Sequence, residues 1–244
     1  MLFLSFLDYI YLAKRSTTFW SITQKARVVD MILKAEHVSK TIKNAQILKD
    51  INLELSGGTV YGFTGRNGSG KTMLFRALSG LMRLTEGTVT LDGKTLGKDF
   101  SVLPSLGIVL ENVGLFANMT GKENLKYLAG LTGRVGGKEI THALERVGLD
   151  PEDKRTYRKY SLGMKQRLAI AQAIMESPDV IMLDEPTNGL DDGGVELIRK
   201  LITEEKQRGA IVLLASHNRD DIKLLADKLY RIESGELKEL EAMT

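Results

Sequence analysis

The sequence has no cysteine, only four prolines and a single tryptophan among its 244 residues. The lack of cysteine excludes disulfide bonds and thiolate metal sites, which fits a cytosolic protein. No apolar run approaches the 18 or more residues that a membrane-spanning helix needs. Acidic and basic residues nearly balance, with a net charge of +3, and Lys and Arg are scattered, so no nucleic-acid partner is expected. The 43% of apolar residues are enough for one large α/β domain, or for a core with a subdomain.

One glycine-rich stretch fits the phosphate-binding pattern G-x-x-x-x-G-K-[ST]. Its residues are Gly65, Arg66, Asn67, Gly68, Ser69, Gly70, Lys71 and Thr72. It lies between an expected strand at 59–63 and an expected helix at 73–78, so backbone N–H groups and the helix N-terminus can hold phosphate oxygens. Lys71 can then reach the β- and γ-phosphates, and the Thr72 hydroxyl can ligate Mg²⁺. The pattern in this context predicts nucleotide binding, not an ordinary glycine-rich turn.

Apolar runs and helical periodicities alternate along the rest of the chain. Strands are expected at 32–38, 47–55, 59–63, 87–91, 106–111, 180–183 and 210–215, and a hairpin around 234–235. Helices are expected at 73–78, 121–131, 138–147, 161–175, 195–207 and 220–226. This alternation predicts an α/β fold whose core is a mainly parallel sheet between helices.

Residues 1–30 do not follow this pattern. Residues 1–13 are largely apolar and precede Lys14 and Arg15, the reverse of the order in a signal peptide. A short interfacial helix is one interpretation. The interpretation that we favour is an accessory extension, or translation upstream of a natural start at Met31.

Two carboxylates, Asp184 and Glu185, directly follow the apolar run at 180–183. A strand there would deliver both to the C-terminal edge of the sheet, where open α/β sheets bind ligands. Asp184 is then placed to hold Mg²⁺, and Glu185 to orient and polarise the attacking water. A strand that ends in two acids more often supplies a helix cap, but the loop at 65–72 favours the catalytic interpretation.

The segment 160–167 reads Tyr-Ser-Leu-Gly-Met-Lys-Gln-Arg and resembles the LSGGQ signature motif of ATP-binding cassette (ABC) ATPases. Residues 186–191 look like the D-loop of this family, and His217 looks like its switch histidine. The resemblance covers about 31–240. It implies a P-loop NTPase fold with a mainly parallel RecA-like core sheet, an N-terminal antiparallel β part and an inserted helical subdomain. The implied divisions are an accessory extension at 1–30, a nucleotide-binding core at 31–112 and 176–244, and a helical signature subdomain at 113–175.

The resemblance also implies a site shared between two cassettes. Ser161 is a good N-cap for the next helix, and the small Gly163 leaves its backbone open. The signature of each cassette would cap the γ-phosphate held by the other, in a homodimer or in a heterodimer with another ABC ATPase subunit. His217 would contact the same γ-phosphate, and Asp191 would link the two sites. The signature residues in question are Ser161, Leu162, Gly163 and Met164.

Three positions depart from the family pattern. Ile42 stands where an aromatic residue usually stacks on adenine, and Met73 replaces a Ser or Thr but keeps its backbone N–H. Glu111 replaces the Gln of the loop that senses the γ-phosphate. We expect Ile42 and Met73 to line the nucleotide, and Glu111 to join Thr72 and Asp184 around Mg²⁺.

The implied function is the ATP-hydrolysing subunit of an ABC transporter, with ATP and Mg²⁺ as ligands. Such a subunit would dock on a separate integral-membrane permease, through 111–125 and neighbouring helices, at the inner face of the cell membrane. The signature variant and Glu111 resemble the branch linked to bacitracin-type resistance, lantibiotic self-protection and multidrug export. The alternative is a soluble ABC ATPase of repair or translation, although its usual coiled-coil insertion or second cassette is not seen. A regulatory subunit with little turnover is disfavoured by Glu185.

Overall fold

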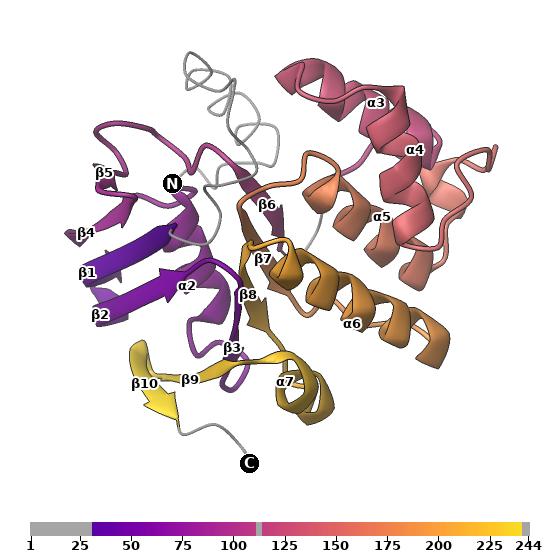
Figure 1. Cartoon of the computed structure of the whole chain (residues 1–244). Helices are drawn as coiled ribbons and strands as arrows, with labels where there is room; N and C mark the ends of the chain where they lie inside the picture. The colour runs from indigo at the N-terminus through magenta and orange to yellow at the C-terminus, as the bar shows by residue number, and fades with distance from the viewer. Residues whose placement is uncertain (1–30, 111–113, 241–244) are drawn as a thin grey trace.

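The computed structural model describes residues 31–110 and 114–240. The expected accessory extension at 1–30 and Glu111 lie outside these described residues. Two β-sheets and a set of helices enclose one apolar core (Figure 1). Among the helices of the described part, none combines the length and the apolar character that crossing a membrane requires.

Within residues 31–110 and 114–240, the larger sheet has six strands in the order β10-β9-β3-β8-β7-β6. Its strands are β3 (Thr59–Thr64), β6 (Leu106–Val109), β7 (Val180–Asp184), β8 (Ile211–Ala215), β9 (Lys228–Glu233) and β10 (Glu236–Leu240). All of their pairings are parallel except that of β10 with β9. Every residue of β7 and β8 is buried, because helices cover both faces of a parallel sheet. The predicted mainly parallel core sheet is confirmed.

The smaller sheet is antiparallel, in the order β2-β1-β4-β5. Its strands are β1 (Ile32–Ile42), β2 (Ala45–Ser56), β4 (Glu86–Leu91) and β5 (Lys94–Thr95). The register of β1 shifts between Ala35 and Val38, and both His37 and Asp50 have positive φ, so β1 and β2 carry bulges. The hydrogen bond between their side chains, with Nδ1 and Oδ1 2.7 Å apart, lowers the pKa of Asp50. With these bulges β1 continues four residues past its expected end.

The helices lie close to their expected positions. They are α2 (Lys71–Ser79), α3 (Gly121–Thr132), α4 (Gly137–Arg146), α5 (Leu162–Ile174), α6 (Asp192–Gln207) and α7 (Arg219–Leu225), with a short 3₁₀ helix η2 (Tyr157–Lys159). Helices α3, α4 and α5 follow one another between β6 and β7 and gather on the side of the molecule away from β1 and β2 (Figure 1).

The expected start of α6 at 195 is wrong, since the helix begins three residues earlier, at Asp192. Residues 191–194 include no apolar side chain that would mark the first turn of the helix. However, the Asp191 side chain caps the helix by accepting a hydrogen bond from the Gly194 N–H at 3.0 Å. A Cβ on Gly194 would lie 2.7 Å from Asp191 Oδ1, so a larger residue there would require the capping side chain to shift.

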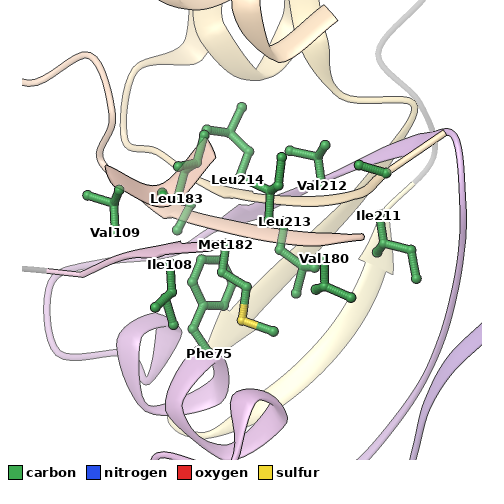
Figure 2. Packing of buried hydrophobic residues seen from close by; sticks show 14 of the residues in the cluster. Phe75, Ile108, Val109, Val180, Met182, Leu183, Ile211, Val212, Leu213 and Leu214 are labelled. Atoms are coloured by element: carbon green, nitrogen blue, oxygen red, sulfur yellow. The ribbon is translucent and has the colours of Figure 1, made fainter. Parts of the chain in front are cut away.

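The core joins α2 to the central strands. Figure 2 shows Phe75 of α2 among side chains of β6, β7 and β8. Its ring also meets Phe63 of β3 edge to face, with centroids 5.5 Å apart. Each large side chain buried in this way contributes about 1.5–3 kcal/mol. This packing holds α2 and the strand ends that carry the candidate site in fixed positions relative to one another.

Candidate nucleotide-binding and hydrolysis site

The predicted site residues gather at one edge of the larger sheet. Strands β3, β8 and β7 are adjacent and parallel, and Phe63 pairs with Ala215, which pairs with Asp184 on its other side. The phosphate-loop segment, the Asp184–Glu185 pair and His217 thus leave the sheet at the same level. This is the edge where open α/β sheets bind ligands.

The phosphate-loop segment at 65–72 curls back between β3 and α2. Gly65, Gly68 and Gly70 have φ values of 152°, 77° and 116°, a region that favours glycine. At Gly65 a Cβ would lie only 2.3 Å from the carbonyl oxygen of Ile232, so no side chain fits there. Arg66 and Asn67 point outward and are exposed. The sequence therefore folds locally into a tight loop that opens on the N-terminus of α2.

Two polar groups inside this loop suit a phosphate. Ser69 Oγ is buried and has no hydrogen-bond partner within the described residues. Lys71 Nζ donates to the carbonyl oxygens of Gly65 and Arg66 at 2.7 and 3.3 Å, and Lys71 is only 7% exposed. Since the described residues offer this buried hydroxyl no partner and this buried ammonium two carbonyl oxygens, both groups would gain from an incoming anion.

The candidate magnesium ligands are already in contact. Thr72 Oγ1 donates to Asp184 Oδ2 at 2.5 Å, and Asp184 is buried. Within the described ranges no three His, Cys, Asp or Glu side chains converge on a metal position. Mg²⁺ usually takes one or two protein carboxylates and completes its shell with phosphates and water, so a hydroxyl with one carboxylate fits this ion.

Glu185 is held by its backbone as well as by its side chain. Its N–H donates to the Ala215 carbonyl oxygen at 2.8 Å, and its φ of 51° is a left-handed value for a residue other than glycine. Its carboxylate accepts from the His217 backbone N–H at 3.0 Å and lies 2.7 Å from His217 Nδ1. Strained backbone of this kind is often found at functional sites. The His217 side chain is 66% exposed, so its other ring nitrogen is accessible to a ligand.

The signature residues lie at the N-terminus of α5. Ser161 caps this helix, as predicted, by accepting from the Met164 N–H at 3.2 Å. Leu162 is 67% exposed. A Cβ on Gly163 would lie 3.0 Å from the Gly189 carbonyl oxygen, so the signature packs against 189–190 of its own chain.

Gln166 belongs to the signature segment at 160–167, but the sequence alone suggested no role for its side chain. From the second turn of α5, its Nε2 donates to the carbonyl oxygens of Glu185 and Pro186 at 3.1 and 3.3 Å. The signature helix is thereby bonded to the backbone of the candidate catalytic residue.

Three other predicted residues lie in the described part of the chain, and a fourth does not. Ile42 is half-buried at the end of β1, and the next strand, β2, passes within 3.4 Å of the Cβ position of Gly70. Met73 is half-buried in the first turn of α2. Asp191 caps α6, while Glu111 is outside the described residues.

The fold and this edge define a P-loop nucleotide-binding protein, and comparison with known proteins gives its family. The family model described as ABC transporter matches residues 48–188. An uncharacterized ABC transporter ATP-binding protein of Bacillus subtilis, YybJ, is 42% identical, over 84% of this chain and 94% of its own length. The bacitracin transport ATP-binding protein BcrA of Enterococcus faecalis is 37% identical, over 87% of this chain and 70% of its own length.

A solved structure agrees. It is a dimeric post-hydrolysis state of the ATP-binding cassette MJ0796 bound to ADP and Pi, with a TM-score of 0.79 and 25% identity over 87% of this chain and 99% of that one. The chain belongs to the ABC transporter family, as an ATP-binding subunit with ATPase activity. The predicted fold, the family and its bacitracin-resistance-like branch are confirmed, and the transporter is favoured over a soluble ABC ATPase.

Proposed function

We propose that this chain hydrolyses ATP with Mg²⁺ at the edge formed by β3, β8 and β7. The observation that supports this most directly is the convergence of two contacts there. They are Thr72 Oγ1 with Asp184 Oδ2 at 2.5 Å, and Glu185 with His217 at 2.7 Å. In this proposal the loop 65–72 holds the phosphates, with the backbone N–H of Met73 continuing the row of donors, and Ile42 packs against the base.

Each of the described site residues would have a separate role in hydrolysis. Lys71 would exchange its carbonyl partners for the β- and γ-phosphate oxygens. Thr72 and Asp184 would hold Mg²⁺, which neutralises charge on those oxygens, and Glu111 is proposed as a further ligand. Glu185 would orient the attacking water and accept its proton. His217 can bond Glu185 through Nδ1 and the γ-phosphate through Nε2 when both ring nitrogens carry a proton.

We propose that two cassettes pack head to tail, in a homodimer or in a heterodimer with another ABC ATPase subunit. The N-terminus of α5, with Ser161–Met164, would cap the γ-phosphate held by the partner cassette, and Asp191 would link the two sites. Leu162, large, apolar and exposed, would be covered by this contact. The cassette similar in structure to this chain is a dimer bound to ADP and Pi, which supports the arrangement.

We propose further that the subunit works on the inner face of the cell membrane, docked on a separate permease through 111–125. The similarity to a bacitracin transport ATP-binding protein supports export of a peptide antibiotic, a drug or a lipid-like cargo. The proposed division into a core at 31–112 and 176–244 and a helical part at 113–175 places this docking segment at the start of the helical part.

A pair of variants at Thr72 tests the magnesium site. Thr72→Ala removes the hydroxyl that now bonds Asp184, whereas Thr72→Ser keeps it. We expect the Mg²⁺ concentration for half-maximal ATPase activity to rise about tenfold, or ~1.4 kcal/mol, in the Ala variant and to stay near wild type in the Ser variant. The measurement is ATP hydrolysis by the purified full chain over a Mg²⁺ titration. Equal Mg²⁺ requirements in the two variants would contradict the assignment.

Ile42 leads to an expectation on base selectivity. An aliphatic side chain offers no ring to stack on adenine, an interaction worth about 0.5–1.5 kcal/mol between aromatic groups. We expect ATP and GTP to bind within about tenfold of each other, and Ile42→Tyr to tighten ATP binding. Competition against a fluorescent nucleotide measures both, with Ile42→Leu as the aliphatic control. A hundredfold preference of the wild type for ATP would show that another residue stacks on the base.

A further inference from the structure

The segment 185–191, which follows β7, carries Glu185 at one end and Asp191 at the other. Its backbone is irregular, with positive φ at Glu185 and at Gly189. Two hydrogen bonds hold the start of this segment. The Glu185 N–H donates to Ala215 of β8, and the Gln166 side chain of α5 donates to the Glu185 carbonyl oxygen. A third contact comes from α7. Thr187 Oγ1 donates to Asp221 Oδ2 at 2.5 Å.

Asp221 is a carboxylate with no exposed surface, on the short helix α7. Its second oxygen, Oδ1, accepts from Arg199 of α6, with Nη2 at 2.7 Å and Nε at 2.8 Å. Burial alone would lower the pKa of Arg199, but hydrogen bonds and the charges of Asp221 and Glu196 outweigh it and raise that pKa. A buried carboxylate with a fixed cation on one oxygen can bind a hydroxyl firmly on the other.

The position of Asp221 in the chain links this contact to the chemistry. Asp221 comes four residues after His217, and α7 begins between them with Asn218 as its N-cap. Thr187 comes two residues after Glu185. The Glu185–His217 and Thr187–Asp221 contacts therefore join the same two segments twice, a few residues apart. Two such contacts fix both the separation and the orientation of the two segments, whereas a single contact would let one segment rotate relative to the other.

We propose that Asp221 is a positioning residue for ATP hydrolysis: through the Thr187 hydroxyl it holds Glu185 against His217 in the orientation that activates water. This inference rests on the proposed role of Glu185. The ion pair of Arg199 with Asp221 joins α6 to α7 and stabilises the fold at this point. The Thr187 hydroxyl is the part that reaches the catalytic segment, so it can be tested with the ion pair left in place.

The test compares Thr187→Val with Thr187→Ser in the full chain. Val keeps the shape of Thr without the donor, and Ser keeps the donor without the methyl group. We expect Thr187→Val to lower kcat about tenfold with the KM for ATP within twofold, since binding uses other residues, and Thr187→Ser to retain at least half of the wild-type kcat. A kcat for Thr187→Val within twofold of wild type would overturn the proposal.

A double-mutant cycle separates positioning from general damage. If Thr187 acts through Glu185, then Thr187→Val should not lower the residual single-turnover rate of Glu185→Gln any further. A further tenfold loss in that background would overturn the proposal. Should Thr187→Val fail to fold, Asp221→Asn, which keeps the size of the side chain, is taken through the same cycle with the same two outcomes. The Mg²⁺-dependent ATPase activity of the wild-type chain is measured before that of any variant. Its absence would refute the proposed function itself.

Discussion

In the Glu185→Gln variant we expect ATP binding to persist while hydrolysis falls by about a hundredfold or more. General-base catalysis contributes about 10²–10⁴-fold, and the amide cannot accept the proton of the attacking water. Gln has the same length and can still accept from the His217 N–H, so the segment should keep its shape. The phosphate loop and the Thr72–Asp184 contact are untouched, so nucleotide affinity should change less than about threefold.

The variant should also accumulate as an ATP-bound dimer, because the ATP hydrolysis that would let the two cassettes separate is blocked. Gel filtration with light scattering, with and without MgATP, measures this, and phosphate release measures turnover. Glu36→Gln is a matched control, since Glu36 is an exposed carboxylate of the antiparallel sheet that pairs with Lys34. Wild-type turnover in Glu185→Gln, or a monomer at saturating ATP, would contradict the proposed mechanism.

The arrangement of this site could be predicted because its residues stand at strand ends. Unbroken apolar runs at 180–183 and 210–215 indicate buried parallel strands, and parallel strands bring their C-terminal ends to one edge. Once the glycine-rich loop followed a third such strand, Lys71 and Asp184 could be expected at one edge, whereas the role of His217 came from the resemblance to ABC ATPases. The Ser161 cap was predictable for a similar reason, because a cap is a local contact.

Contacts between distant side chains could not be predicted in this way. Asp221 belongs to a short polar helix, and nothing in its neighbourhood shows that this aspartate, and not the exposed Asp220, turns inward to Thr187. The bulge at His37 leaves no mark on the apolar pattern, since one extra residue shifts the register without changing the composition. The apolar pattern placed the start of α6 at 195, because residues 191–194 include no apolar side chain that would mark the first turn.

Gly163→Asp should strongly reduce turnover while nucleotide binding persists. The signature would meet the nucleotide of the partner cassette, so the change leaves the chain's own phosphate loop intact. It places a negative charge at a helix N-terminus proposed to face a phosphate, and a Cβ 3.0 Å from the Gly189 carbonyl oxygen. We expect hydrolysis to fall about a hundredfold, or ~2.7 kcal/mol, with ATP affinity within threefold of wild type. Gly137→Asp, at a glycine with open space around it in α4, is the matched control.

Mixing the two inactive variants tests whether the site is shared between chains. In a mixed dimer, the loop and Glu185 of the Gly163→Asp chain face the intact signature of the Glu185→Gln chain, so one complete site is formed. An equimolar mixture should therefore recover at least about tenfold more phosphate release than either variant alone. Measuring release against the mixing ratio should give a maximum near equal amounts, because only mixed dimers contribute. A mixture with no more activity than its two parts would mean that the signature does not act on the nucleotide of a second copy, and would leave a different ABC subunit as its partner.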